Sequence, residues 1–170
     1  MWKTILFTTL VSFFLGVFTT LYTQRYAPEF KLRQKKNTSY DYLVQLADSY
    51  AKRYHIPSPL FRAVIKVESN WNISAISSQG AVGLGQLMLS AADDCGLSAH
   101  ERYNPEKNLK CSAWHLARHK RNWKSWRNAL YAYNWGHGNL SRKGKHNAPR
   151  ETRRYADMIL KKWQKAQNKV

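Results

Sequence analysis

The sequence is short of acidic residues. Its 170 residues include 28 Lys and Arg but only 10 Asp and Glu, which gives a formal net charge of +18 at pH 7. Such an excess suits a polyanionic partner: a nucleic acid, an anionic membrane surface or an acidic cell-wall polymer. It also leaves few candidates for acid–base chemistry. The length suffices for one domain with a real core, because a domain of this size buries about two-thirds of its unfolded surface.

Cysteines and strand patterns are scarce as well. The two cysteines, Cys95 and Cys111, are too few for a disulfide scaffold. They could close one disulfide, which would stabilise the fold by about 3 kcal/mol for a loop of this size and would fit an exported protein. That the two thiols are unrelated is an equally favoured alternative. No alternating apolar and polar run is longer than three or four residues, and no internal repeat is present. The chain is therefore predicted to be mainly α-helical.

An uncharged apolar run occupies residues 5–22. It is long enough to cross a bilayer, and no small-residue cleavage site follows it, so an uncleaved anchor is favoured over a cleaved signal peptide. We expect an anchor or signal segment over residues 1–22, a basic linker over 23–38 and one domain over 39–170. Basic residues after the run outnumber those before it, and this count opposes export of the domain.

One acid lies in an apolar setting, on a helix that begins near Ser58. Ser58 is a good N-cap, and Pro59 suits the first helical position. At about 100° per residue, the apolar side chains of this helix form one broad face, and Glu68 lies inside it. A carboxyl group on an apolar wall has a raised pKa, which is how a general acid is made. A Glu turned out to water at a frayed helix end is the alternative.

The remaining segments are also predicted to be helical or to be loops. Helical spacing begins at Ser39 and stops at Pro57. Further helices are expected over residues 86–95, 108–119, 125–134 and 149–167. A glycine-rich loop, Gly80 to Gln86, follows the first two helices of the domain. It lacks the Lys-Ser or Lys-Thr of a nucleotide loop, and its glycines would let the backbone approach a ligand closely.

Two further patterns in the sequence bear on binding. Cys111, His115 and His119 are spaced four apart on a predicted helix, which could gather a metal on one face. No carboxylate joins them at ligand spacing, so a solvated, basic helix face is favoured and no metal is expected. The seven Trp and ten Tyr suit sugar rings or nucleic-acid bases.

In chain order, these features resemble the soluble lytic transglycosylase domain, the family related to goose-type lysozyme. The resemblance is carried by Glu68-Ser69-x-Trp71-Asn72, Gly80-Ala81-x-Gly83-Leu84-x-Gln86-x-Met88, Asn104-Pro105-x-x-Asn108-Leu109, Ala132-Tyr133-Asn134-x-Gly136 and Glu151-Thr152-x-x-Tyr155. It covers roughly residues 40–160. The chain departs from the family at Asn104, where Asp is usual, and at Ser112 and His115, where Gly and Tyr are usual.

The resemblance implies a lysozyme-like helical fold and a peptidoglycan lytic transglycosylase that needs no metal or cofactor. Glu68 would act alone as acid and base at the bond between N-acetylmuramic acid and N-acetylglucosamine, and a 1,6-anhydro sugar would form. Ser69 would orient the system. Gln86, Asn134 and Tyr155 would line the site, with Met88 and Tyr133 as walls of sugar subsites.

Two other functions remain open: a basic nucleic-acid-binding module, and a catalytically silent peptidoglycan-binding subunit of the cell envelope. The order of the motifs disfavours the first, so no nucleic acid is expected. The expected partners are glycan strands, the inner membrane through residues 5–22, and a secretion or conjugation apparatus or a phage lysis system. The small stand-alone domain and weakly apolar anchor favour the phage system. The substrate would place the domain in the periplasm, either anchored or secreted after cleavage.

Overall fold

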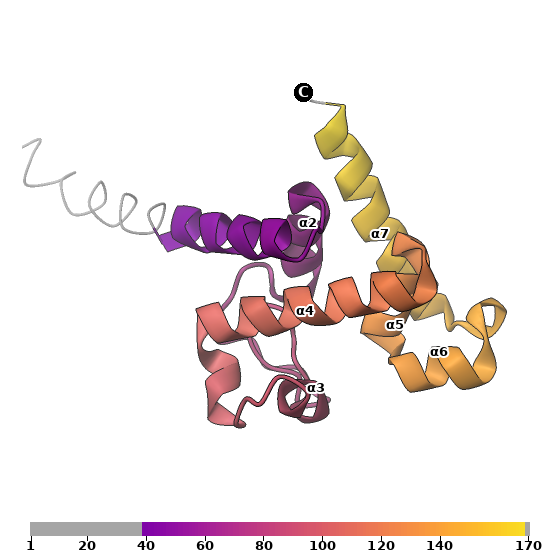
Figure 1. Ribbon diagram of the computed structural model, residues 1–170, viewed down its shortest axis with the longest axis horizontal. Coiled ribbons are helices and arrows are strands. Elements are labelled where there is room, and N and C mark those ends of the chain that lie inside the picture. The colour runs from indigo at the N-terminus through magenta and orange to yellow at the C-terminus, as the bar shows by residue number, and fades with distance from the viewer. Residues whose placement is uncertain (1–38, 169–170) are drawn as a thin grey trace, which may run out of the picture. The chain divides into compact units, whose positions relative to one another are not determined.

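The computed structural model of the chain describes residues 39–168, and these are mainly helical, as predicted (Figure 1). Isolated β-bridges join Val82 to Ile76 and to Leu87. Residues 39–168 contain no extended β-strand beyond these bridges. The expected anchor and basic linker, residues 5–22 and 23–38, lie outside the described residues. Within residues 39–168, no helix has both the length and the apolar character that a membrane crossing requires.

Helices α4 and α5 pack extensively against each other. A first helix covers residues 39–53. The others are α2 (Ser58–Ser69), α3 (Leu89–Asp93), η1 (His100–Tyr103), α4 (Pro105–Trp123), α5 (Trp126–Trp135), α6 (His137–Lys143), η2 (Lys145–Asn147) and α7 (Arg150–Gln167). Helix α5 packs against α4, α6 and α7, and α7 also packs against α2 (Figure 1). The helix that carries Glu68 is therefore held in place by the last helix of the chain.

The core is built from the apolar faces that helical spacing predicts. Its largest fully buried apolar side chains are Leu60, Phe61, Val64, Ile65, Leu84, Leu109, Leu116, Leu130, Leu140 and Ile159. Burying one such side chain contributes about 1.5–3 kcal/mol. Because α2, α4, α5 and α7 all contribute to this one cluster, α2 packs against the hydrophobic core of the domain.

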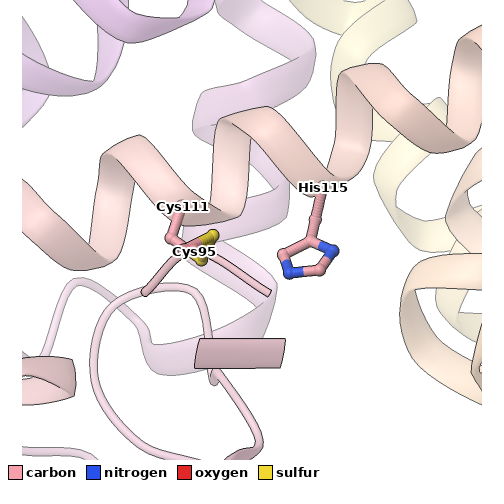
Figure 2. A group of neighbouring side chains, drawn as sticks. All are labelled: Cys95, Cys111 and His115. Carbon is pink, nitrogen blue, oxygen red and sulfur yellow. A yellow bond between two sulfur atoms is a disulfide. The ribbon is translucent and has the colours of Figure 1, made fainter. Parts of the chain in front are cut away.

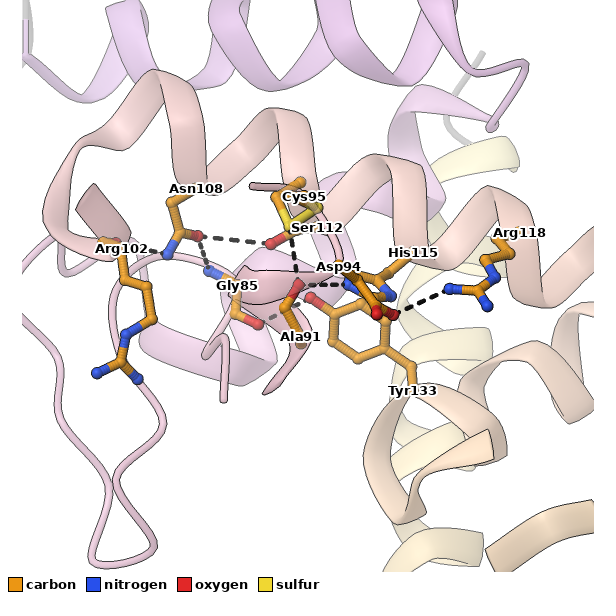
Figure 3. Close-up of a disulfide and its surroundings, with 11 residues drawn as sticks. Gly85, Ala91, Asp94, Cys95, Arg102, Asn108, Ser112, His115, Arg118 and Tyr133 are labelled. Atoms are coloured by element: carbon orange, nitrogen blue, oxygen red, sulfur yellow. Dashed lines mark hydrogen bonds and ion pairs between the residues drawn. A yellow bond between two sulfur atoms is a disulfide. The ribbon is translucent and has the colours of Figure 1, made fainter. Parts of the chain in front are cut away.

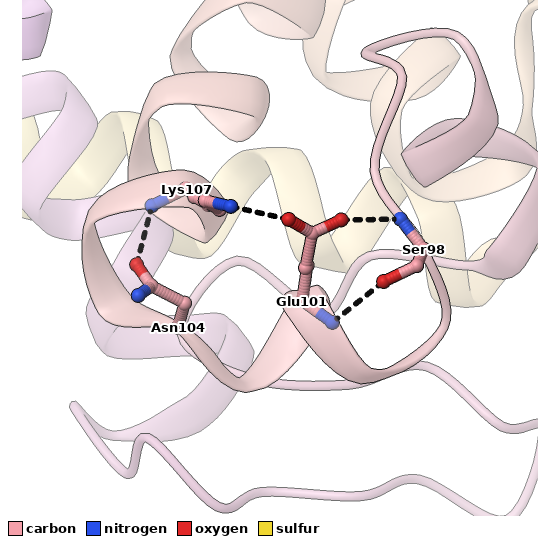
Figure 4. A network of polar contacts seen from close by, with 4 residues as sticks. All are labelled: Ser98, Glu101, Asn104 and Lys107. Carbon is pink, nitrogen blue, oxygen red and sulfur yellow. Dashed lines mark hydrogen bonds and ion pairs between the residues drawn. The ribbon is translucent and has the colours of Figure 1, made fainter.

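The helix ends follow local capping chemistry, with small shifts from the predicted positions. Pro57 rather than Ser58 stands at the N-cap of α2, and the helix ends where Asn70 takes a left-handed conformation (φ 53°). Helix α4 begins after Asn104, whose side-chain oxygen accepts from the backbone N–H of Lys107 at 3.0 Å (Figure 4). Asn caps a helix as well as Asp does, so the departure from the family at this position preserves the cap.

A small ion-pair network holds the turn before α4. The Glu101 carboxylate accepts from the Lys107 ammonium group and from the backbone N–H of Ser98, and the Ser98 hydroxyl accepts from the N–H of Glu101 (Figure 4). These hydrogen bonds and the Lys107 charge hold the pKa of Glu101 low, at about 2. The carboxylate therefore stays ionised and fixes η1 against the first turn of α4.

Two predictions about helices are wrong. The helix expected over residues 86–95 is only Leu89–Asp93, because the chain around Val82 and Leu87 closes into a β-bridge instead. Helix α6 was not predicted: Gly136 and Gly138 favour a break after residue 134, whereas Gly138 lies inside α6. The helix expected over residues 108–119 exists but is longer, spanning all of α4.

Candidate active site

Glu68 lies in the last turn of α2 and is only partly exposed. Burial raises the pKa of its carboxyl group to about 7, and the hydrogen bond from Tyr155 opposes that rise. Near neutral pH, the protonated and ionised forms are therefore both populated. A carboxyl group in this state can donate a proton and take one back, as a single acid–base catalyst must.

Tyr155 reaches Glu68 from α7. Its hydroxyl donates to Glu68 Oε1 at 2.5 Å, across 87 positions of sequence. Burial, and then the neighbouring Glu68 charge, raise the pKa of the tyrosine well above its ordinary value, so the hydroxyl keeps its proton. The contact between α2 and α7 thus supplies Glu68 with a fixed donor.

The glycine-rich loop is held by one buried side chain, Asn108 of α4, which is 1% exposed. Its Oδ1 accepts from the N–H of Gly85 at 2.8 Å. Its Nδ2 donates to the carbonyl oxygen of Val82 at 3.0 Å. It also donates to that of Arg102 at 2.7 Å (Figure 3). Each of these bonds replaces one to water, and losing one would leave a buried polar group unpaired. Asn108 therefore fixes the loop against α4.

The two inner glycines are needed because the loop approaches α4 so closely. A Cβ at Gly83 would lie 2.4 Å from Asn108 Nδ2, and a Cβ at Gly85 would lie 1.9 Å from Ser112 Oγ. Real Cβ atoms do not come this near to another side chain. The sequence suggested that these glycines make room for a ligand, whereas the structure shows them making room for the protein's own helix.

A cavity of about 430 Å³ lies beside the loop. Its lining brings together four predicted site residues: Gln86, Met88, Tyr133 and Asn134. Tyr133 also donates its hydroxyl to the carbonyl oxygen of Gly85 at 2.8 Å (Figure 3). Gln86, in a left-handed conformation (φ 50°), donates its amide to the carbonyls of Gly83 and Ala75. Cavity wall and loop are thus one hydrogen-bonded unit.

Ser69 and Glu68 are not among the residues that line this cavity. The Ser69 side chain is buried, and its hydroxyl donates to the carbonyl oxygen of Ile65 on its own helix at 3.3 Å. Burial, and then the Glu68 charge, raise the pKa of the Tyr133 phenol, which does line the cavity. Tyr133 thus links the acid electrostatically to the cavity.

Histidines form another part of the wall, where a solvated helix face was predicted. That prediction is wrong, because Cys111, His115 and His119 are only 2%, 7% and 8% exposed. Burial, then the neighbouring His115 and His137, lower the pKa of His119 to about 4, and burial also lowers that of His115. The rings of His119 and His137 stack with centroids 6.0 Å apart. The rings of His115 and His119 are therefore uncharged at neutral pH, and Arg118 and Asp94 supply the charges of this lining.

Three contacts tie α3 to α4. Cys95 and Cys111 form a disulfide (Figure 2). The carbonyl oxygen of Ala91 lies 2.8 Å from His115 Nε2, and the Asp94 carboxylate accepts from Arg118 at 2.9 Å (Figure 3). The two sulfurs and His115 lie close enough for a metal site, but bonded sulfurs offer no thiolate ligand. Since α3 follows directly after Met88, these contacts position one wall of the cavity.

Sequence reasoning gave no site role to Asn108, Ser112 or Thr152. Thr152 donates its hydroxyl to Asn134 Oδ1 at 2.8 Å and so orients that amide toward α7. A signal for the other two was present: Asn108 and Ser112 lie four apart among the apolar residues of α4. A polar side chain inside an apolar arc needs a partner, and here the partner is the glycine-rich loop.

The fold is similar to that of solved lytic transglycosylases. A lytic transglycosylase Slt from Pseudomonas aeruginosa, solved as an inactive mutant, matches with a TM-score of 0.62 at 23% identity over 73% of this chain. The 70 kDa soluble lytic transglycosylase of Escherichia coli matches with a TM-score of 0.62 at 24% identity over 70% of this chain. A 70-kDa soluble lytic transglycosylase in complex with bulgecin A matches with a TM-score of 0.66 at 23% identity over 73% of this chain.

The matched regions are 24%, 23% and 24% of those chains, so this chain spans about a quarter of their length. The sequence model of the transglycosylase SLT domain matches residues 45–156 of this chain. The chain belongs to the transglycosylase SLT domain family. All of the site residues described above, from Glu68 to Tyr155, lie within the matched residues.

Proposed function

We propose that this chain is a peptidoglycan lytic transglycosylase in which Glu68 is the single general acid and base. The observation that carries the proposal is the Glu68 carboxyl group itself: it is largely shielded from water, has a pKa of about 7 and accepts a hydrogen bond from Tyr155. Membership of the SLT family supports the reaction class.

The proposed reaction balances without water. Glu68 gives its proton to the glycosidic oxygen as the bond from C1 of N-acetylmuramic acid to that oxygen breaks, with the N-acetyl group assisting at C1. The resulting carboxylate then takes the proton of the C6 hydroxyl, whose oxygen bonds to C1 and closes a 1,6-anhydro ring. An intramolecular nucleophile has a large entropic advantage over a free water. Tyr155 hydrogen-bonds the carboxylate formed between the two steps.

A second function, hydrolysis, has one observation in its favour. Asp94 lines the cavity, and hydrolysing glycosidases generally use a second carboxylate to activate water or trap the sugar. However, Asp94 is paired with Arg118, and its side chain is 50% exposed. An ion-paired, solvated carboxylate at the α3 end of the cavity is better suited to holding α3 against α4 than to catalysis.

The products of digestion distinguish the two functions. Purified wild-type chain, Glu68→Gln and Asp94→Asn are each incubated with sacculi, and the soluble muropeptides are analysed by mass spectrometry. We expect 1,6-anhydro products from the wild type and Asp94→Asn, and a loss of at least about 100-fold in rate for Glu68→Gln, since removing an acid–base group costs 10²–10⁴-fold. Products one water heavier, together with an inactive Asp94→Asn, would establish a hydrolase instead.

The substrate implies that the domain works outside the cytoplasm, held there by residues 5–22. A reporter fused after Val170 tests this placement. Alkaline phosphatase in that position is expected to be active, and green fluorescent protein exported through the unfolded-chain route is expected to be dark. The opposite pair of results would contradict the placement.

A further inference from the structure

The positive charge of the chain is distributed unevenly. Residues 39–106 contain Lys52, Arg53, Arg62, Lys66 and Arg102 against seven acids, whereas residues 107–168 contain sixteen basic residues against two acids, Glu151 and Asp157. Fourteen of the sixteen lie beyond the first turns of α4: Arg118, Lys120, Arg121, Lys124, Arg127, Arg142, Lys143, Lys145, Arg150, Arg153, Arg154, Lys161, Lys162 and Lys165. We call these fourteen the basic region.

The basic region is open to solvent and comes from neighbouring elements of the fold. Its residues come from the end of α4 and from α5, α6, η2 and α7. Helices α4, α6 and α7 pack against α5, and η2 packs against α6 (Figure 1). None of the fourteen is buried. Among the described residues, only Arg118 and Arg127 of this region form ion pairs with acids, namely Asp94 and Asp157. Most of its charge is therefore available to a partner.

The region borders the cavity of the proposed active site. Arg118 is itself part of the cavity lining. Trp135 also lines the cavity, and the Lys143 ammonium group lies over its ring, 5.7 Å from the centroid. A long ligand that leaves the cavity past Trp135 would thus run onto α6 and its basic neighbours. This placement favours a polymer whose anionic groups repeat along its length.

The aromatic residues nearby argue against a membrane or a nucleic acid as that partner. Trp126 and Trp163 are half-buried and packed edge to face, with centroids 6.5 Å apart, and Lys120 lies over the Trp126 ring. Rings packed on each other in this way offer little face for stacking bases or for entering a lipid interface. What the surface presents is mainly charge.

We propose that the basic region is a second binding surface for the substrate, which holds the carboxylates of stem peptides on glycan strands that extend beyond the cavity. The inference rests on the proposed function. It identifies the preferred substrate as a long, peptide-bearing strand rather than a short or peptide-free glycan. Exposed ion pairs contribute little one at a time, but many act together on a polymer that meets them in series.

The test measures binding rather than catalysis, in the Glu68→Gln background. One variant replaces four exposed basic residues of the region by Gln: Lys145, Arg150, Arg154 and Lys161. A matched control removes the same charge from exposed positions elsewhere: Lys52, Arg53, Lys66 and Lys110. Each is pelleted with intact sacculi and with glycan strands stripped of peptides by an amidase and then amidated at the lactyl carboxylates that the amidase exposes. Circular dichroism verifies the fold of both variants.

We expect the first variant to bind intact sacculi about tenfold more weakly, from four exposed pairs of a few tenths of a kcal/mol each. The control should change by about twofold or less, and both should bind stripped strands equally. Equal weakening of both variants on sacculi would overturn the proposal, as would a tenfold difference that persists on stripped strands. The proposal would also be overturned if the Glu68→Gln parent did not bind sacculi but did bind phosphatidylglycerol vesicles or an oligonucleotide. Undigested sacculi with the wild type would instead refute the proposed function.

Discussion

Glu68→Gln is expected to stabilise the protein at alkaline pH while it removes activity. In the folded chain the pKa of Glu68 is about 7, against an ordinary value of 4.5. The folded state therefore holds this proton more tightly than the unfolded state does. The stability that protonation provides is complete below about pH 4.5 and is lost as the pH rises through 7. At about 1.4 kcal/mol per pKa unit, ionised Glu68 costs the folded state about 3 kcal/mol.

Glutamine fills the same space, accepts the bond from Tyr155 and never ionises. The variant should consequently gain up to about 3 kcal/mol over the wild type at pH 8, or roughly 6–12 °C in melting temperature, and almost nothing at pH 4. Urea denaturation at both pH values measures the difference. Glu151→Gln, at an exposed position in the first turn of α7, is the control and should change stability by less than about 1 kcal/mol. An equal gain for Glu68→Gln at both pH values would refute the reasoning.

Three further outcomes are expected. Wild-type activity should fall above about pH 7, because Glu68 must carry its proton to act as the proposed acid. Tyr155→Phe removes the hydrogen bond that favours the carboxylate form of Glu68, so the fall in activity should move to higher pH. A move to lower pH would contradict this. Gly85→Ala should cost about 1–3 kcal/mol of stability in urea, and adding Ser112→Gly should recover part of it, since the new methyl group meets the Ser112 side chain; full tolerance of Gly85→Ala alone would show that the loop is not tightly packed. Dithiothreitol can reduce only one disulfide in this chain, and it should speed amide exchange over residues 86–97 far more than in α7; unchanged exchange there would show that the bridge does not hold α3.

Local sequence patterns predicted the long helices well. Helix α7 spans Arg150–Gln167 against an expected 149–167, and α5 spans Trp126–Trp135 against 125–134. Each has one apolar face and clear boundaries, so residues three and four apart carry the information. The unusual position of Glu68 on an apolar face could be seen in the same way, because it depends only on the neighbours of Glu68 along α2.

Contacts between distant segments could not be predicted from such patterns. Nothing near Glu68 indicates that its partner is Tyr155, and nothing near Gly85 indicates that its N–H bonds to Asn108. The predicted helix over residues 86–95 failed for the same reason, since its first residues are drawn into a loop held by α4. The family resemblance supplied most of the site residues, but the role of Asn108 emerged only from its hydrogen bonds.

The bond between Tyr155 and Glu68 also has a consequence for the order in which the chain is made. Glu68 lies on the second helix of the domain, but its donor lies on the last, and the loop beside it is fixed only when Asn108 is in place. A chain interrupted during synthesis before α7 would have the acid without its donor and without the helix that supports α2. Under the proposed function, the active site can assemble only after the chain is complete, because unfinished copies carry Glu68 without the contacts that hold it.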